Sequence, residues 1–401
     1  MTRPRRRLVA NLLAQLAFGL VAMTICLPSM QQWGALLGGS QASVQLTFSG
    51  FVVAYGALQL LYGPLSDRLG RKKILLIGLA VAGLGSVWAA LAGSLPSLIA
   101  ARTLQGAGCA AGMVVGRALV QDLFQGPDRT RVMAYVGMAM GLCPPLATIV
   151  GGQLHVRLGW QANFVLVALM AAGLAVAAWR GLPAAQPKPA TDTVAATHWW
   201  PAMRASYARL AHEPVFLLFV VILSMTTATF YAFLAGAPIV LGSQGVGPDG
   251  VGFYIMSIPL AYIGGNFLTS RLVRRAGERR IMAIGQGCTV AALLGVITLA
   301  AIGLNHPLAF ALPLVLLGVG HGLLMPPTLA GTVGVVPALA GSAAAVAGLM
   351  QQLLGAFGGY TVGLVSHDGA LNLGLLMLAF TSCSVLALAW MQRRHAPAVT
   401  A

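Results

Sequence analysis

Charged residues are scarce in this sequence: they make up 8% of its 401 residues, whereas 58% are hydrophobic. A soluble domain usually carries about a quarter charged residues, so a globule of this length could not cover its surface with so few. Acidic residues are especially rare, with 8 Asp and Glu against 24 Lys and Arg. The composition therefore excludes a soluble globular protein and indicates a chain that is solvated by lipid.

Other scarcities exclude further classes of protein. The formal net charge of +16 would suit nucleic acid, but the basic residues lie in short runs between apolar stretches and form no basic face, so we expect no nucleic-acid partner. The sequence contains no H-E-x-x-H, no G-x-S-x-G and no Walker loop, so we expect no catalytic residues and no enzyme. The cysteines are odd in number and embedded in apolar sequence, which predicts neither disulfides nor a metal site: Cys26, Cys109, Cys143, Cys288 and Cys383.

Apolar stretches long enough to cross a bilayer fill most of the chain. A span needs about 20 mostly apolar residues. Twelve are predicted, at 8–30, 43–65, 74–94, 97–120, 132–154, 161–180, 214–237, 251–271, 281–302, 308–330, 341–364 and 371–391. The first is long and no small-residue cleavage site follows it, which favours an uncleaved anchor over a signal peptide.

Basic residues accumulate on one side of these spans. Arg3 and Arg5 to Arg7 precede the first span, and every later loop on that side is basic, whereas the opposite loops carry one basic residue, Arg157. The positive-inside rule therefore predicts that both termini are cytoplasmic.

The chain divides into two halves that echo one another. A polar stretch at 181–213 predicts a cytoplasmic linker between an N-terminal six-helix bundle, 1–180, and a C-terminal bundle, 214–401. The string GRKKI follows the second span at 70–74, and GERRI follows the eighth at 277–281, 207 residues later. Parallel repeats of this kind build the central cavity of one class of transporter; a chance match between two basic loops is the alternative.

Three motifs carry a resemblance to a known family. The string GPLSDRLGRK at 63–72 resembles the signature loop between helices 2 and 3 of the major facilitator superfamily. RTLQGAG at 102–108 is similar to its R-x-x-Q-G-x-G motif, and GLCPP at 141–145, followed by Gly151 and Gly152, is a loose version of its antiporter motif. Further strings, such as GMVVGRALVQDLF and AGSAAAVAGLMQQ, resemble the Bcr/CflA-type drug exporters.

The resemblance implies a fold and a function. The fold is an all-α membrane protein of twelve transmembrane helices in two pseudo-symmetric six-helix bundles. The function is secondary active efflux of small, amphipathic drugs or metabolites by alternating access in exchange for protons. We expect a monomeric carrier in a bacterial inner membrane, with a small-molecule substrate and no cofactor besides the proton gradient. The alternative is a proton-independent facilitator or metabolite carrier of the same fold.

Charged residues at the motifs are candidates for gating. The resemblance implies a bridge between Arg71 and Asp122 and a contact of Asp67 with the start of the eleventh span, which together latch the cytoplasmic side. An ordinary surface salt bridge, worth roughly 0–1 kcal/mol, is the alternative.

Arg102 is predicted to lie inside the bilayer, about 8 Å from the end of its helix at ~1.5 Å per residue. A charge there is a functional candidate, and an arginine snorkelling to the headgroups is the alternative. Relatives usually carry an aspartate in the first helix at the position that Thr24 occupies here, and the eight acids of this chain fall in loops or at helix ends. Proton exchange would then depend on His321 or Asp122, because histidine titrates near physiological pH; a hydrogen-bonded neutral histidine is the alternative.

Polar and aromatic residues near mid-membrane are predicted to bind the substrate. Such a lining adapts to varied apolar ligands while a few amides orient them. Without a carboxylate it favours a neutral or anionic substrate beside Arg102. Each residue alone is as readily a packing residue or an interhelical hydrogen bond. The predicted set is Thr24, Tyr55, Gln59, Gln105, Tyr231, Tyr262, Gln351 and Gln352, with Thr226, His321 and Met113 nearby.

Overall fold

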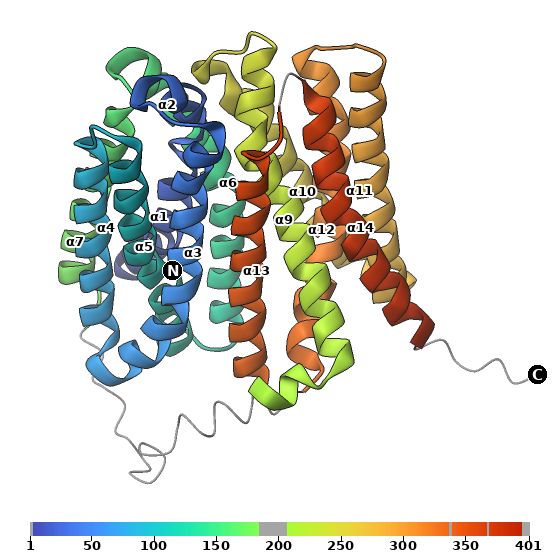
Figure 1. The fold of residues 1–401 in the computed structure, drawn as a ribbon. Coiled ribbons are helices and arrows are strands. Elements are labelled where there is room, and N and C mark those ends of the chain that lie inside the picture. Colours follow the sequence, from blue (N-terminus) through green and yellow to red (C-terminus); the bar gives the residue numbers. More distant parts are fainter. Residues whose placement is uncertain (1–2, 184–206, 337–338, 367–368, 395–401) are drawn as a thin grey trace, which may run out of the picture. The chain divides into compact units, whose positions relative to one another are not determined.

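The computed structural model describes residues 3–183, 207–336, 339–366 and 369–394, and this part of the chain contains helices and no strand (Figure 1). Most of the predicted linker therefore lies outside the described residues. The helices of the first half are α1 (Arg3–Thr24), η1 (Leu27–Ser29), α2 (Met30–Leu37), α3 (Gln41–Leu69), α4 (Arg71–Ala90), α5 (Leu95–Leu123), α6 (Gly126–Leu158) and α7 (Gln161–Gly181). Those of the second half are α9 (Pro214–Ser243), α10 (Pro248–Ala276), α11 (Glu278–Ala301), α12 (Pro307–Gly334), α13 (Ala340–Val362) and α14 (Ala370–Arg394).

Each predicted span coincides with a long helix, with one difference. The span predicted at 8–30 is interrupted: α1 ends at Thr24, and η1 and α2 continue in its place. Among the residues searched, ten helices are long and apolar enough to cross a membrane. The prediction of an all-α membrane protein is confirmed.

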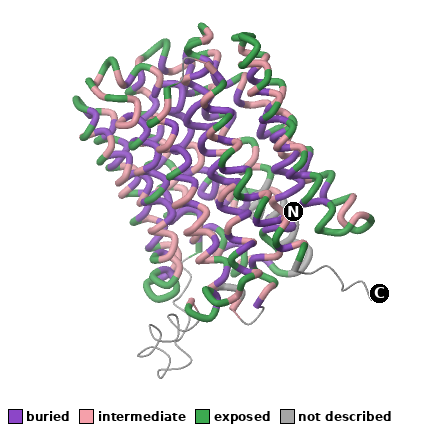
Figure 2. The backbone as a smooth tube through the Cα atoms, turned by 45° about the vertical axis from the view of Figure 1, so that its right-hand side comes forward, coloured by how far each residue is buried: buried purple, intermediate pink, exposed green. Residues whose placement is uncertain are grey.

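Large apolar side chains are exposed along the helices. Leu84, Leu169, Leu312 and Leu386 are between 63% and 68% exposed, and Figure 2 shows buried and exposed residues alternating along the helices. Soluble monomers rarely expose apolar patches beyond a few hundred Å². We assign these side chains to contact with lipid.

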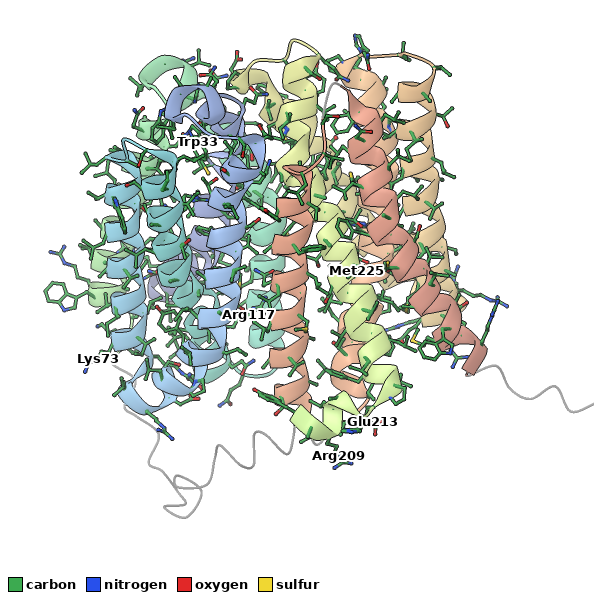
Figure 3. All side chains as sticks on the ribbon, viewed as in Figure 1. Trp33, Lys73, Arg117, Arg209, Glu213 and Met225 are labelled. Atoms are coloured by element: carbon green, nitrogen blue, oxygen red, sulfur yellow. The ribbon has the colours of Figure 1, made fainter. Side chains whose placement is uncertain are left out.

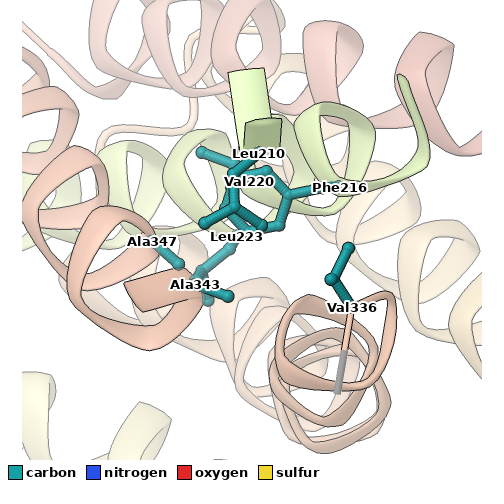
Figure 4. Packing of buried hydrophobic residues seen from close by; sticks show 7 residues of the cluster. All are labelled: Leu210, Phe216, Val220, Leu223, Val336, Ala343 and Ala347. Carbon is teal, nitrogen blue, oxygen red and sulfur yellow. The ribbon is translucent and has the colours of Figure 1, made fainter. Parts of the chain in front are cut away.

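The described chain forms two compact units. One contains the described residues of Met1–Pro189, Leu234–Met256 and Gly359–Ser366, and the other contains those of Ala190–Phe233, Ser257–Gly358 and His367–Ala401. The domain boundaries predicted from the sequence, at residues 180 and 214, stay a prediction. The second unit has a core cluster built from α9, the segment before it and the α12–α13 region (Figure 4): Leu210, Phe216, Val220, Leu223, Val336, Ala343 and Ala347.

Glycines bring the helices of the first unit into backbone contact. A Cβ at Gly106 of α5 would collide with the carbonyl of Phe51 on α3, and a Cβ at Gly108 would collide with the backbone of Ala82 on α4. A small residue is therefore required at both positions for α5 to approach its two neighbours.

The second unit repeats this arrangement. A Cβ at Gly318 of α12 would meet the carbonyl of Ile258 on α10, and one at Gly320 would meet Thr289 on α11. Ile258 and Thr289 each follow their counterparts, Phe51 and Ala82, by 207 residues, which is also the offset of the two basic loops. The glycines themselves, Gly318 and Gly320, follow Gly106 and Gly108 by 212 residues. Offsets that differ by only five residues between the loops and the packing contacts argue against a chance match and for an internal repeat.

Candidate functional site at the break in the first helix

The break in the first span follows from Pro28. Proline lacks the N–H that would bond the carbonyl four residues earlier, and its ring disfavours helical backbone at Leu27. Helix α1 therefore ends at Thr24, and its last four carbonyls need partners from elsewhere. The first of them, on Val21, accepts the N–H of Ile25 at 3.0 Å.

Arg102 of α5 satisfies the next two carbonyls. Its Nη1 donates to the carbonyl of Ala22 at 2.8 Å and to Oε1 of Gln105, and its Nη2 donates to the carbonyl of Met23 at 3.3 Å. The side chain is fully buried, so the snorkelling alternative is wrong. The fourth carbonyl, of Thr24, accepts from Oγ1 of Thr148 at 3.4 Å. All four carbonyls at the break are thereby accounted for.

Dipoles and rings, rather than an acid, compensate the charge of Arg102. The carbonyl end of a helix carries roughly half a negative charge, which favours a cation. The guanidinium also lies over the ring of Phe51, 4.4 Å from its centroid, and 5.8 Å from that of Phe164, within range of a cation–π interaction. No ion pair to Arg102 occurs in the described part of the chain, and its Nε is buried without a hydrogen bond there.

Part of the predicted substrate set joins this site. Gln105 bonds Arg102 on one side and donates to Oγ of Ser86 on the other, at 2.7 Å. Tyr55 stacks on Phe51, the ring beneath Arg102, with centroids 6.0 Å apart. Gln59 lies one turn further along α3 and is half-buried.

The hydroxyl of Thr24 already makes two hydrogen bonds. Its Oγ1 donates to the carbonyls of Leu20, at 2.8 Å, and Pro144, at 3.3 Å. The position that the resemblance assigns to a proton-binding acid therefore holds a buried hydroxyl that ties α1 to the Pro-Pro segment of α6.

A second polar cluster lies on the other side of the break. His155 in the last turn of α6 contacts Oγ of Ser29 through Nδ1, at 2.9 Å, and Oε1 of Gln32 through Nε2, at 3.1 Å. Asn163 of α7 donates to the same Ser29 oxygen at 3.1 Å. Sequence reasoning missed these residues, because polar residues near the ends of apolar spans resemble loop residues.

Aromatic rings pack around this cluster. Trp33, which follows Gln32, is fully buried and stacks on Phe164 with centroids 6.1 Å apart, while Trp160 meets its edge at 5.8 Å. Figure 3 shows Trp33 and Lys73 at opposite ends of the first unit. The break and both polar clusters thus lie toward the Trp33 end.

Three of the predicted gating residues, Asp67, Arg71 and Asp122, lie at the Lys73 end. Arg71 begins α4 and bonds Asp67 at 2.5 Å, Asp122 at 3.2 Å and Oγ of Ser66 at 2.7 Å. The bridge between Arg71 and Asp122 is therefore present. The contact of Asp67 with the eleventh span, and the latching role, stay predictions.

The other predicted residues lie in the second unit. Tyr231 donates to Oε1 of Gln352 at 3.1 Å, and Gln351 donates to Oγ1 of Thr227 at 3.0 Å. Tyr262 bonds Asn266 on its own helix. His321 is buried, at 4% exposure, and no hydrogen bond to its ring is found in the described part of the chain.

A threonine, a serine and a glutamine form a further polar contact in the second unit. Thr226 lies 3.4 Å from Oγ of Ser384, which also accepts from Gln286. Met113, in the first unit, is buried.

Comparison with known proteins identifies the family. Residues 8–359 match the family model described as Major Facilitator Superfamily. Multidrug resistance protein D of Escherichia coli (strain K12) is 28% identical over 382 residues, which cover 94% of each chain. The chloramphenicol resistance protein of Pseudomonas aeruginosa is 29% identical over 322 residues, 79% of this chain and 74% of that protein.

Solved structures show the same fold. The nucleoside transporter NupG superposes with a TM-score of 0.77 at 14% identity, covering 97% of this chain and 100% of that one. A D-xylose-proton symporter superposes with a TM-score of 0.74 at 16% identity, covering 96% of both chains. With the family match across most of its length, the chain belongs to the major facilitator superfamily and is a multi-pass membrane transporter rather than an enzyme.

Proposed function

We propose that this carrier exports small, neutral or anionic amphipathic molecules by alternating access. The observation that carries the proposal is the match to multidrug resistance protein D over 94% of both chains. The Arg102 site bears on the charge of the substrate. It holds a buried cation beside aromatic rings, and no acid is ion-paired with it among the described residues. Such a site disfavours a cationic substrate, because a like charge at low dielectric is costly.

We place the carrier in a bacterial inner membrane, with both termini cytoplasmic, as a monomer. The relatives come from bacteria, and the basic residues of the loops follow the positive-inside rule. Protease protection in right-side-out and inverted vesicles tests the orientation. Cleavage of a C-terminal tag in right-side-out vesicles would contradict it.

We further propose that export is driven by exchange for protons, with no other cofactor. Asp122 and His321 are the proton-binding candidates that the sequence supplies. The alternative, a facilitator without proton coupling, is favoured by one observation: Thr24 stands where the resemblance implies an acid, and its hydroxyl is held by two carbonyls.

Transport by the purified protein in lipid vesicles tests the proposal. Chloramphenicol is a suitable first probe, because it is small and uncharged and because the name of one relative refers to resistance to it. We expect saturable counterflow of chloramphenicol at equal pH on both sides, and no counterflow of a lipophilic cation of similar size. Accumulation that follows an imposed pH gradient supports the exchanger, and counterflow without such accumulation supports the facilitator. Counterflow of the cation alone would refute the proposed substrate class.

A further inference from the structure

The cluster of His155, Ser29, Gln32 and Asn163 is placed where proton binding would act on the break in the first helix. Ser29 ends η1, and Gln32 lies in the first turn of α2, so the ring of His155 holds both elements that follow the break. Arg102 holds the carbonyls that precede the break. The break is therefore fixed by the permanent charge of Arg102 on one side and by the titratable ring of His155 on the other.

The contacts of the ring can accommodate both protonation states. In the neutral state, Nε2–H donates to Oε1 of Gln32, Nδ1 accepts the hydroxyl hydrogen of Ser29, and Asn163 donates to the Ser29 oxygen. When a proton from water binds Nδ1, that nitrogen becomes a donor to Ser29, whose hydroxyl hydrogen must turn elsewhere. The Oδ1 of Asn163 is buried and accepts no hydrogen bond among the described residues, so it can take this hydrogen once the amide turns.

The surroundings favour a charge on this histidine over one on His321. His155 lies in the last turn of α6, where the helix dipole stabilises a cation. Its side chain is 9% exposed, and two acceptors already contact its ring. His321 lies in the middle of α12 at 4% exposure, without a hydrogen-bonded partner in the described chain. An unpartnered charge at that depth costs several kcal/mol.

Few other charged groups face His155. Helix α2 has none, the arginine of α7 lies in its last turn at the opposite end, and Arg157 on α6 is exposed. Arg102 on α5 is committed to the carbonyls of α1. On α10, the backbone of Asp249 lies against Gly152, about one helical turn before His155, and the Asp249 side chain is exposed.

We propose that His155 binds the exchanged proton in this carrier, in place of the acid that the resemblance implies at position 24. The proposal rests on the proton exchange proposed above. Protonation gives the ring a second N–H donor and strengthens its bonds to Ser29 and Gln32, since hydrogen bonds from a charged donor are roughly twice as strong. The segment after the break is then held more firmly to α6 in the protonated state than in the neutral one.

Transport by a His155→Gln variant in vesicles tests the proposal. Glutamine retains hydrogen-bonding groups but cannot take up the proton. His212→Gln is the matched control, because His212 is exposed at the start of the second half. With one proton exchanged per substrate, a gradient of about one pH unit supports an accumulation of about tenfold. We expect wild type and His212→Gln to accumulate chloramphenicol to that extent. We expect His155→Gln to lose gradient-driven accumulation to a far greater extent than it loses counterflow.

The outcomes separate this proposal from the proposed function. Gradient-driven accumulation by His155→Gln would overturn the assignment of His155 and leave proton exchange standing. Counterflow by the wild type without a response to the gradient would overturn proton exchange itself, and the assignment with it.

A direct titration covers the case in which His155→Gln fails to fold. Full-length wild-type protein labelled at histidine contains seven imidazoles, and the resonance that changes in Asn163→Leu identifies His155. We expect this ring to take up a proton within the pH range over which the vesicles show gradient-driven accumulation. A ring that stays neutral across this range would overturn the proposal.

Discussion

Replacing Arg102 by lysine keeps the positive charge in the first unit but removes the guanidinium, two of whose nitrogens bind the carbonyls at the end of α1. The guanidinium makes three hydrogen bonds, to the carbonyls of Ala22 and Met23 and to Gln105. An ammonium is a compact point charge on a shorter reach, and it can keep one of the three. The variant therefore loses two hydrogen bonds of a charged group.

The magnitude follows from these contacts. A hydrogen bond to a charged group contributes about 1.5–3 kcal/mol, and a buried carbonyl left without a donor costs about 1–3 kcal/mol. Two lost bonds at the lower end of the range amount to about 3 kcal/mol. The contact of the cation with Phe51 is weakened as well. We expect Arg102→Lys to be destabilised by about 3 kcal/mol and to lose most of its transport.

Equilibrium unfolding in detergent and counterflow in vesicles measure the two effects. Arg274→Lys is the matched control, since Arg274 is exposed in the last turn of α10, and it should change the unfolding free energy by less than about 0.5 kcal/mol. If Arg102→Lys were as stable as Arg274→Lys, the forked contact with the carbonyls would not hold the break, and the account of the site would be refuted.

Three further predictions concern the first unit. Thr24→Asp should be more stable at pH 5 than at pH 7.5, because only a protonated carboxyl can donate to the carbonyls of Leu20 and Pro144. Its unfolding free energy should fall by up to about 1.4 kcal/mol for each unit by which the pH rises. A flat profile of unfolding free energy against pH would contradict this. Gly106→Ala should lower the unfolding free energy by about 1–3 kcal/mol, because the new Cβ would collide with the α3 backbone. The control Gly173→Ala places its Cβ in open space, so it should be neutral or stabilising by up to about 1 kcal/mol. Equal unfolding midpoints for the two variants would refute the close approach of α5 to α3. Asp67→Asn should alter transport rates while changing the unfolding free energy by less than about 1 kcal/mol, and unchanged rates in the vesicle assay would remove its latching role.

The fold was predictable because the bilayer imposes a simple rule. Each span must be a long apolar helix, so hydropathy and basic loops located all the long helices. The break at Thr24 was not located, although its cause, Pro28, is visible in the sequence. A proline in a membrane helix is often accommodated by neighbouring groups, so its presence alone does not indicate where the helix ends.

The site was predictable only in part. Arg102 and Gln105 were found because a charge and an amide stand out in apolar sequence. Their partners were not, since backbone carbonyls carry no sequence signal. His155 was overlooked for a related reason: its importance comes from Ser29 and Asn163, which lie 126 and 8 residues away along the chain and meet it only in the folded protein.

The carbonyl partners of Arg102 also bear on how the membrane voltage acts on transport. A carboxylate partner could gain and lose a proton during the cycle, but a carbonyl cannot, so the charge of this site is the same in every step. The net charge moved per cycle is then set by the substrate and the exchanged proton alone. Exchange of one proton for an uncharged molecule moves one elementary charge, to which the voltage contributes about 2.3 kcal/mol per 100 mV. Export of a neutral compound by this protein should therefore be electrogenic, and a potassium diffusion potential alone should drive it.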